Sequence, residues 1–164
     1  MTNQEKISSI IRHIKKVEDN CNIIAKHFEK EGFLDLALLM IKLGREHDLS
    51  KFDKYEFKNL NSQASEDKFK IALALHQERN KHHPEYWIKQ GETIHQMPVP
   101  YLAEMVCDCV ARAQEFGTDA RKWFENEATV KYGFKMEDII GKAIKEYLDL
   151  LLPQPFKKSS EKVQ

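Results

Sequence analysis

The sequence predicts an all-α fold made of a single domain. Apolar residues recur at three- and four-residue steps through most of the chain, which is typical of amphipathic helices. No stretch alternates apolar and polar residues for long enough to predict a strand. The length of 164 residues suits one domain with a sizeable core. We therefore expect a helical bundle of about six or seven helices over residues 1–152, followed by a flexible tail over residues 153–164.

The N-terminal part of the chain contains two expected helices and a shorter third. Apolar residues from Ile7 to Phe28 follow helical steps, and Gly32 is a typical helix terminator. Residues 33–46 are apolar nearly all round, so we expect this second helix to be central to the core. A short helix is expected within residues 53–61.

The remainder of the chain contains four more expected helices. Pro84 interrupts or restarts the chain after the first of them, because proline suits a first helical turn and not a helix interior. Thr118 is expected to cap the third. Pro153 and Pro155 end the last one. The expected helices are residues 66–81, 101–116, 118–132 and 135–151.

Composition excludes several classes of function. The 26 basic and 26 acidic residues cancel and form no basic stripe, so a duplex nucleic acid is not an expected partner. The longest apolar run, residues 33–43, is broken by charges and too short to span a bilayer, and the N-terminus lacks a signal-peptide core. Three cysteines without framework or zinc-knuckle spacing favour a reducing environment. We expect a cytoplasmic protein without a membrane partner, and a homodimer is compatible with the sequence.

Side chains that ligate metals fall on the core-facing sides of four expected helices. Asp108 is surrounded by apolar residues, where a carboxylate is costly to bury unless something positive meets it. The break at Pro84 leaves open whether His82 or His83 points inward. Bundle folds build metal centres from side chains on facing helices in this way. The candidate metal ligands are His13, His47, Asp48, His76, His83 and Asp108.

Each of these features also has a purely structural interpretation. A lone His13 is more often a satisfied, partly buried histidine than a ligand. The His47-Asp48 pair could close the second helix, with Asp48 or Ser50 capping the next one. Both interpretations stay open at the level of sequence.

The remaining candidates have similar alternatives. Asp108 could form an ion pair with Arg112 one turn later or with Arg45. The pair His82-His83 could mark a helix end where imidazole meets the negative end of the dipole. The occurrence of all four features in one chain, in this order, favours the metal interpretation.

The order His13, then His47-Asp48, then Asp108 resembles the ligand set of the HD-domain superfamily of metal-dependent phosphohydrolases. The dinuclear branches of that superfamily place the histidines of a second metal between the dipeptide and the last aspartate. His76 and His83 lie in that interval here. The resemblance implies an HD-like bundle in which Asp48 bridges two metal ions.

A second resemblance is narrower. "HDLSK" is similar to the "HDxGK" of the cyclic-dinucleotide phosphodiesterase branch, in which the lysine helps to bind phosphate; here it is Lys51. The segments HDLSKF, LHQERNKHHPEYW and MPVPYLAEMVCDC resemble a family of small bacterial and phage proteins classed as a domain of unknown function, over about residues 10–125. The short gap between His76 and His82, and the absence of a glycine-tyrosine-proline signature, separate the chain from the cyclic-dinucleotide branch. Lys51 occupies the acidic position of simple nucleotidases.

These resemblances imply a metal-dependent phosphohydrolase acting on a nucleotide or another small phosphoester. Imidazole and carboxylate ligands suit one or two divalent transition-metal ions and do not choose among Fe, Mn, Co, Ni and Zn. A di-iron HD-type oxygenase and a non-catalytic helical binding protein with a degenerate site are the alternatives. Expected catalytic residues are Asp48, Lys51 and Glu104, and expected substrate-binding residues are Lys51, Arg79, Lys81 and Trp87.

Overall fold

The chain begins with a 28-residue helix, α1 (Asn3–Lys30), in the computed structural model, which describes residues 2–61 and 63–153. A capping box fixes its start: the Thr2 hydroxyl accepts from the Glu5 amide at 3.2 Å, and the Glu5 carboxylate accepts from the Thr2 amide at 2.7 Å. Gly32, with φ +87°, follows the last turn. The predicted end of the first helix is confirmed.

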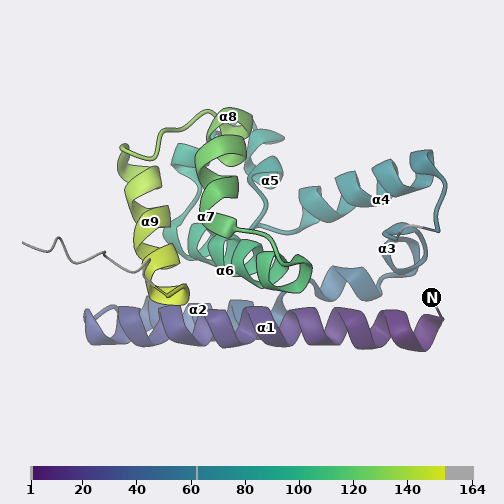
Figure 1. Cartoon of the computed structure of the whole chain (residues 1–164), viewed down its shortest axis with the longest axis horizontal. Coiled ribbons are helices and arrows are strands. Elements are labelled where there is room, and N and C mark those ends of the chain that lie inside the picture. Colours follow the sequence, from purple (N-terminus) through teal and green to yellow (C-terminus); the bar gives the residue numbers. More distant parts are fainter. Residues whose placement is uncertain (1, 62, 154–164) are drawn as a thin grey trace, which may run out of the picture.

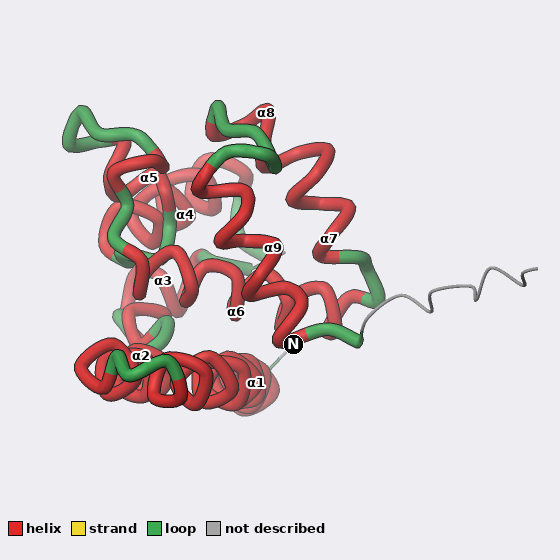
Figure 2. Tube along the Cα trace, turned by 90° about the vertical axis from the view of Figure 1, so that its left-hand side faces the viewer, coloured by secondary structure: helices red, strands yellow, loops and turns green. Residues whose placement is uncertain are grey.

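Helix α2 (Leu34–Glu46) returns along α1, and the two form one layer on one side of the molecule (Figures 1 and 2). The close approach depends on Gly44, where a Cβ atom would lie 2.8 Å from Cys21 Cβ. We expected α2 to be central to the core, and this is wrong: Leu34 and Leu38 are both 57% exposed. A helix in an outer layer buries only the face that meets its neighbours, whatever the hydrophobicity of its other face.

The central helix is α6 (Val99–Phe116), which contacts α1, α2 and α9 (Figure 1). It starts two residues earlier than predicted, after Pro98, and Gly117 ends it with φ +66°. The core forms where these helices meet, from buried residues that include Val17, Ile24, Leu102, Val106, Val110, Ile144 and Leu148.

Between α2 and α6 the chain forms shorter elements that surround one end of α6. Helix α4 ends at Arg79, two residues before the predicted end, and Pro84 starts a new helix as proline at a first turn allows. The elements are η1 (Leu49–Phe52), α3 (Lys54–Asn59), α4 (Glu66–Arg79), α5 (Pro84–Ile88) and η2 (Ile94–Gln96).

The C-terminal segments are α7 (Ala120–Trp123), a continuous π-helical turn η3 (Phe124–Ala128), α8 (Thr129–Tyr132) and α9 (Ile139–Leu151). The N-cap of α7 is Asp119 and not the predicted Thr118, because the Asp119 carboxylate accepts from two first-turn amides. Helix α9 starts after Asp138, four residues later than predicted. The Asp138 side chain accepts from the Gly141 amide at 2.9 Å.

The predicted all-α class and single domain are confirmed, since every regular element within residues 2–61 and 63–153 is helical. With α7, η3 and α8 counted as one continuous helix, these residues form 8 helices, and α5 is the addition to those predicted. None of the described helices has the length and apolarity needed to cross a membrane. The tail expected over residues 153–164 lies outside the described residues, apart from Pro153.

Candidate metal centre

Imidazole and carboxylate side chains from five elements converge along one side of α6. They come from α1, from the turn that follows α2, from α4, from the segment before α5, and from α6. They form three groups whose ligand atoms lie within 4.8 Å of one another. The groups are Asp48 with His76, His82 and His83; His13 with His47 and Asp108; and His47 with His82 and Glu104. Every residue predicted as a metal ligand belongs to one of them.

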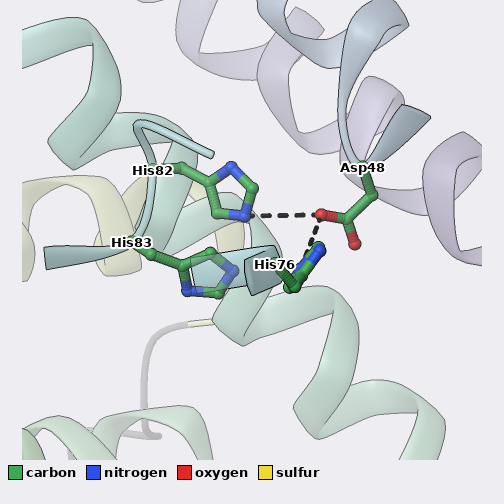
Figure 3. Close-up of side chains that lie close together, drawn as sticks. All are labelled: Asp48, His76, His82 and His83. Atoms are coloured by element: carbon green, nitrogen blue, oxygen red, sulfur yellow. Dashed lines mark ion pairs between the residues drawn. The ribbon is translucent and has the colours of Figure 1, made fainter. Parts of the chain in front are cut away.

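Asp48 lies at the centre of the cluster, and each of its oxygens faces a different pair of histidines. Its Oδ1 lies 3.2 Å from His76 Nε2 and 3.5 Å from His82 Nε2 (Figure 3). Its Oδ2 lies 3.5 Å from His13 Nε2 and 3.4 Å from His47 Nε2. The carboxylate is 1% exposed. This is the arrangement expected of a carboxylate shared between two metal positions.

The backbone at Asp48 explains how consecutive residues both point inward. His47 ends α2, and Asp48 has φ +56°, the only positive φ at a non-glycine residue among those described. Aspartate and asparagine tolerate this left-handed conformation better than most residues. Asp48 makes no side-chain capping bond to η1, and the Ser50 hydroxyl donates to Glu56 instead. The helix-capping alternative therefore leaves the Asp48 carboxylate unexplained.

Carboxylates stand behind four of the histidines, on the side away from the centre. A carboxylate that accepts from Nδ1–H fixes the ring orientation and the tautomer, so that Nε2 presents its lone pair to the centre. This is how proteins orient histidine ligands around metal ions. The pairs, with their Nδ1-to-oxygen distances, are His13–Glu115 (3.2 Å), His47–Glu104 (3.0 Å), His76–Glu56 (3.0 Å) and His82–Glu104 (3.4 Å).

The atoms that face the centre are not hydrogen-bonded to one another. Within the described residues, several buried imidazole nitrogens and carboxylate oxygens have no hydrogen-bond partner, although they lie close together. Each such atom costs about 1–3 kcal/mol if it stays unsatisfied. A cation at the centre would satisfy all of them, and nitrogen and oxygen donors without thiolate suit a divalent transition metal. The atoms are Nε2 of His13, His47, His82 and His83, and Oδ1 of Asp48 and Asp108.

The charges of the cluster reinforce one another. Burial lowers the pKa of His47, but the facing carboxylates of Asp48 and Asp108 outweigh burial and raise it well above its ordinary value. Burial raises the pKa of both aspartates, and the facing imidazoles reverse this and hold it well below the ordinary value. Burial and the neighbouring His82 lower the pKa of His83 well below its ordinary value, so His83 stays neutral. Neutral imidazole is the form that binds metal, so His83 is ready to bind, whereas His47 must first lose its proton in competition with a metal ion.

Lys51 and Glu104, both predicted to be catalytic, lie at the cluster. The Lys51 ammonium forms an ion pair with Asp48, and its side chain is 9% exposed. Glu104 accepts from His47 and faces His82, which places it behind these rings. Of the two roles expected for Glu104, an outer partner of the ligands and a general acid or base, these contacts fit the first.

The other predicted substrate-binding residues make contacts elsewhere. The Arg79 guanidinium pairs with Glu56 at 3.3 Å and is half exposed. The Lys81 ammonium lies 5.4 Å from the centre of the Tyr101 ring. Trp87 packs against the core and donates from Nε1 to the Lys81 carbonyl at 2.8 Å, which fits the packing interpretation of this aromatic residue. Their roles in substrate binding stay predictions.

Of the two ion pairs considered for Asp108, the structure contains the one with Arg112. Arg112 Nε lies 3.8 Å from Asp108 Oδ1, but His13 Nε2 is closer to the same oxygen, at 3.0 Å. Arg45 pairs with Glu18 instead. Asp108 therefore faces the cluster as well as the arginine.

Two carboxylates of the site were missed from the sequence. Glu115 follows Asp108 by two helical turns on the same face of α6, so helical spacing could have identified it. Glu56 is fully buried on the six-residue helix α3, where the sequence carries no periodic signal strong enough to orient it. The structure brings both His82 and His83 into one group of possible ligands, so which of them binds a metal stays a prediction.

Two cavities lie near α6, and only one reaches the cluster. A cavity of about 140 Å³ has His13 and Lys51 in its wall. A larger one, of about 610 Å³, lies between α6 and α7 and is lined by no member of the three ligand groups. The smaller cavity is therefore the candidate approach to the metal centre.

Over residues 2–150 the chain matches the family described as "Family of unknown function (DUF5662)". No curated protein and no solved structure matches it. The expected resemblance to a family of unknown function is confirmed. The bacterial or phage origin and the relation to the HD-domain superfamily stay predictions.

Proposed function

We propose that this chain, which belongs to the DUF5662 family of unknown function, is a metal-dependent phosphohydrolase acting on a nucleotide or another small phosphoester. The proposal rests on one observation: buried Nε2 and carboxylate atoms face a common centre without hydrogen bonds, while carboxylates orient the rings from behind. One or two divalent transition-metal ions held there would supply Lewis acidity, which activates water and stabilises charge at phosphorus.

Two overlapping ligand sets support one or two ions. The distances around Asp48 allow its two oxygens to serve different positions, with His13 and His47 on one side and His76 and His82 on the other. The first set is His13, His47 and Asp108, to which Asp48 would add its Oδ2, and the second is Asp48 with His76, His82 and His83.

Lys51 is the residue that favours an anionic substrate. Its ammonium is nearly buried beside Asp48 and lines the cavity that leads to the cluster. In this position it would stabilise a phosphate oxygen as negative charge develops. A di-iron oxygenase is the second candidate, because the same ligands suit iron, but dioxygen has no charge for this lysine to neutralise.

Metal content and phosphate release test the proposal together. We expect the purified or reconstituted protein to hold one or two metal ions and to release phosphate from at least one member of a nucleotide panel. Asp48→Asn should lose both, because asparagine keeps the left-handed backbone but removes the charge. Asp35→Asn, an exposed aspartate on α2, is the matched control.

Circular dichroism would verify that both variants stay folded. A wild-type protein that binds no metal under either aerobic or anaerobic conditions would refute the proposal, as would full activity in Asp48→Asn. An iron-specific absorption spectrum with oxygen consumption, and no phosphate release, would favour the oxygenase.

The second ion has its own test. His76 Nε2 lies 3.2 Å from Asp48 Oδ1. The ligand atoms of its group all lie within 4.8 Å of one another. If two ions bind, His76→Ala should reduce the stoichiometry to one. A stoichiometry that stays at two would show that the second position is wrongly assigned.

A further inference from the structure

The cavity of about 140 Å³ outside the cluster has an unusual electrostatic character. It lies between α1, the η1–α3 segment and α6, and His13 forms part of its wall at the cluster. Three cations line it, one from each of these regions: Lys6, Lys51 and Arg112. One carboxylate, Glu56, lines it as well, and that group already accepts from His76 and from Ser50.

Lys6 differs from the other two cations because it has no counter-charge. Its side chain is only 9% exposed, and no ion pair joins it to a carboxylate in residues 2–61 and 63–153. Its ammonium lies 4.6 Å from the centre of the Phe57 ring. Lys51, by contrast, pairs with Asp48, and Arg112 lies 3.5 Å from Glu115. Partial burial lowers the pKa of Lys6.

An ammonium without a counter-charge in the wall of a cavity suits an anion that arrives from outside. Burial of an unpaired charge is unfavourable, and charge-assisted hydrogen bonds to phosphate are among the strongest that lysine and arginine make. Arg112 lines the same cavity and is partly exposed. Its guanidinium lies at ion-pair distance from Asp108 and Glu115 and would share these contacts with a ligand.

We propose that Lys6 and Arg112, together with Lys51, bind the phosphoryl group of the substrate in this cavity, and that the substrate is a phosphomonoester carrying this group at its end. The inference rests on the proposed function and specifies its substrate class. Lys6 and Arg112 are positioning residues for the phosphate and are not metal ligands.

The size of the cavity is the reason for a terminal phosphoryl group. Sites that enclose a whole drug-sized ligand have volumes of about 300–1,000 Å³. A cavity of about 140 Å³ holds a phosphoryl group but not the organic part of a nucleotide. Its inner end is closed by His13 and the cluster, so the organic part must remain on the outer side. A phosphodiester carries organic groups on two sides of phosphorus and would not fit.

Binding of inorganic phosphate to the metal-loaded protein tests the site without turnover. Lys6→Met should weaken phosphate binding roughly 10- to 100-fold, which is the effect of losing a hydrogen bond to a charged group. Its metal content should equal that of the wild type. Lys26→Met, at an exposed lysine on the same helix, should bind phosphate normally. Lys6→Arg should retain most of the affinity.

The thermal stability of Lys6→Met separates a binding role from a structural role. If Lys6 is retained for an anion, its replacement should leave the melting temperature unchanged or higher when phosphate is absent. A lower melting temperature, with unchanged phosphate affinity, would overturn the inference and assign Lys6 to the fold.

Chromogenic esters test the substrate class. We expect 4-nitrophenyl phosphate to be hydrolysed with a higher kcat/KM than bis(4-nitrophenyl) phosphate, and Lys6→Met to remove most of that preference. A preference for the diester would overturn the terminal-phosphoryl part. Lys6-dependent phosphate binding without hydrolysis of either ester would refute the proposed function and leave the anion site standing. Ester hydrolysis by a Lys6→Met variant that binds phosphate with wild-type affinity would refute the anion site and leave the proposed function standing.

Discussion

Gly44→Ala tests how the contact between α1 and α2 positions the metal centre. Gly44 lies on α2 about one turn before His47. A Cβ atom there would lie 2.8 Å from Cys21 Cβ and 3.0 Å from Glu18 Cα. Carbon atoms in ordinary contact are about 3.5–4.0 Å apart, so α2 must move away from α1 by roughly 1 Å to accept the methyl group.

The cost has two parts that oppose each other. Glu18 Cα belongs to the backbone of α1 and cannot move away by a change of rotamer, and overpacking of this kind costs about 1–3 kcal/mol. Alanine is favoured over glycine inside a helix by about 0.8–1.0 kcal/mol. We therefore expect the net loss in the free energy of unfolding to be about 0–2 kcal/mol.

The effect on the centre should be comparable in size to the effect on stability. His13 is fixed on α1, whereas His47 and Asp48 are fixed at the end of α2. Asp48 Oδ2 lies 3.5 Å from His13 Nε2, and a relative shift of about 1 Å is large compared with the tolerance of about 0.5 Å of a binding constellation. We expect metal affinity to fall at least about 10-fold.

Competition against a chromogenic chelator measures the affinity, and chemical denaturation in EDTA measures the stability. Asp138→Ala is the control, because it removes a helix cap outside the three ligand groups and should cost about 1 kcal/mol of stability while leaving metal affinity unchanged. Wild-type metal affinity in a destabilised Gly44→Ala would refute the link between helix spacing and the centre. A stability above that of the wild type would refute the tight contact itself, because alanine would then gain its helix propensity without an opposing cost.

Three further predictions concern single side chains. Glu104→Gln should weaken metal binding about 10- to 100-fold in calorimetry, because it disturbs the partner that orients His47; unchanged affinity would contradict this role. Gly141→Ala should lower the free energy of unfolding by about 3 kcal/mol or more, since its Cβ would lie 2.2 Å from the Lys135 carbonyl oxygen, and a wild-type denaturation midpoint would show that this turn yields freely. The backbone amides of Gly141 and Lys135 hold the pKa of Asp138 at about 2, so the cap stabilises the fold above the ordinary carboxyl pKa and this contribution is lost as the pH falls through about 2. The deficit of Asp138→Ala in thermal unfolding should therefore shrink between about pH 4 and pH 2, and a constant deficit would contradict the capping role.

The sequence predicted the existence of the helices better than their places in the fold. Periodicity located α1 and its end at Gly32 because both depend on local geometry. It could not show that α2, although more uniformly apolar, lies in an outer layer while α6 is central. Depth in the fold depends on how many neighbours a helix meets, which local hydrophobicity does not record.

The predicted starts of two helices were wrong because an aspartate caps each helix at another residue. Thr118 and Asp119 are both acceptable caps by residue type, and only the bonds of Asp119 to the following amides select it. In the same way, Asp138 caps α9, although by residue type the helix could have started at residue 135. Errors of a few residues follow from competition among neighbouring capping residues.

For the candidate site, sequence order identified the residues that face the centre but not those that support them. His13 and Asp108 fall on core-facing sides of helices, which periodicity can detect, whereas the His47-Asp48 pair follows α2 and was identified by its order between them. Glu56 reaches His76 only because α3 packs against α4. Supporting contacts of this kind are tertiary, and no spacing along the chain encodes them.

The central position of Asp48 has a thermodynamic consequence. If the centre binds two ions as proposed, their affinities cannot be independent, because the two oxygens of Asp48 face different histidine pairs. Whatever the first ion does to the orientation and charge of this carboxylate changes the binding free energy of the second, and linkage requires the reverse effect to be equal. Titration with metal should therefore follow a coupled, two-step isotherm and not that of two separate sites. In that case the fraction of either position filled by metal depends on the ligands of both positions.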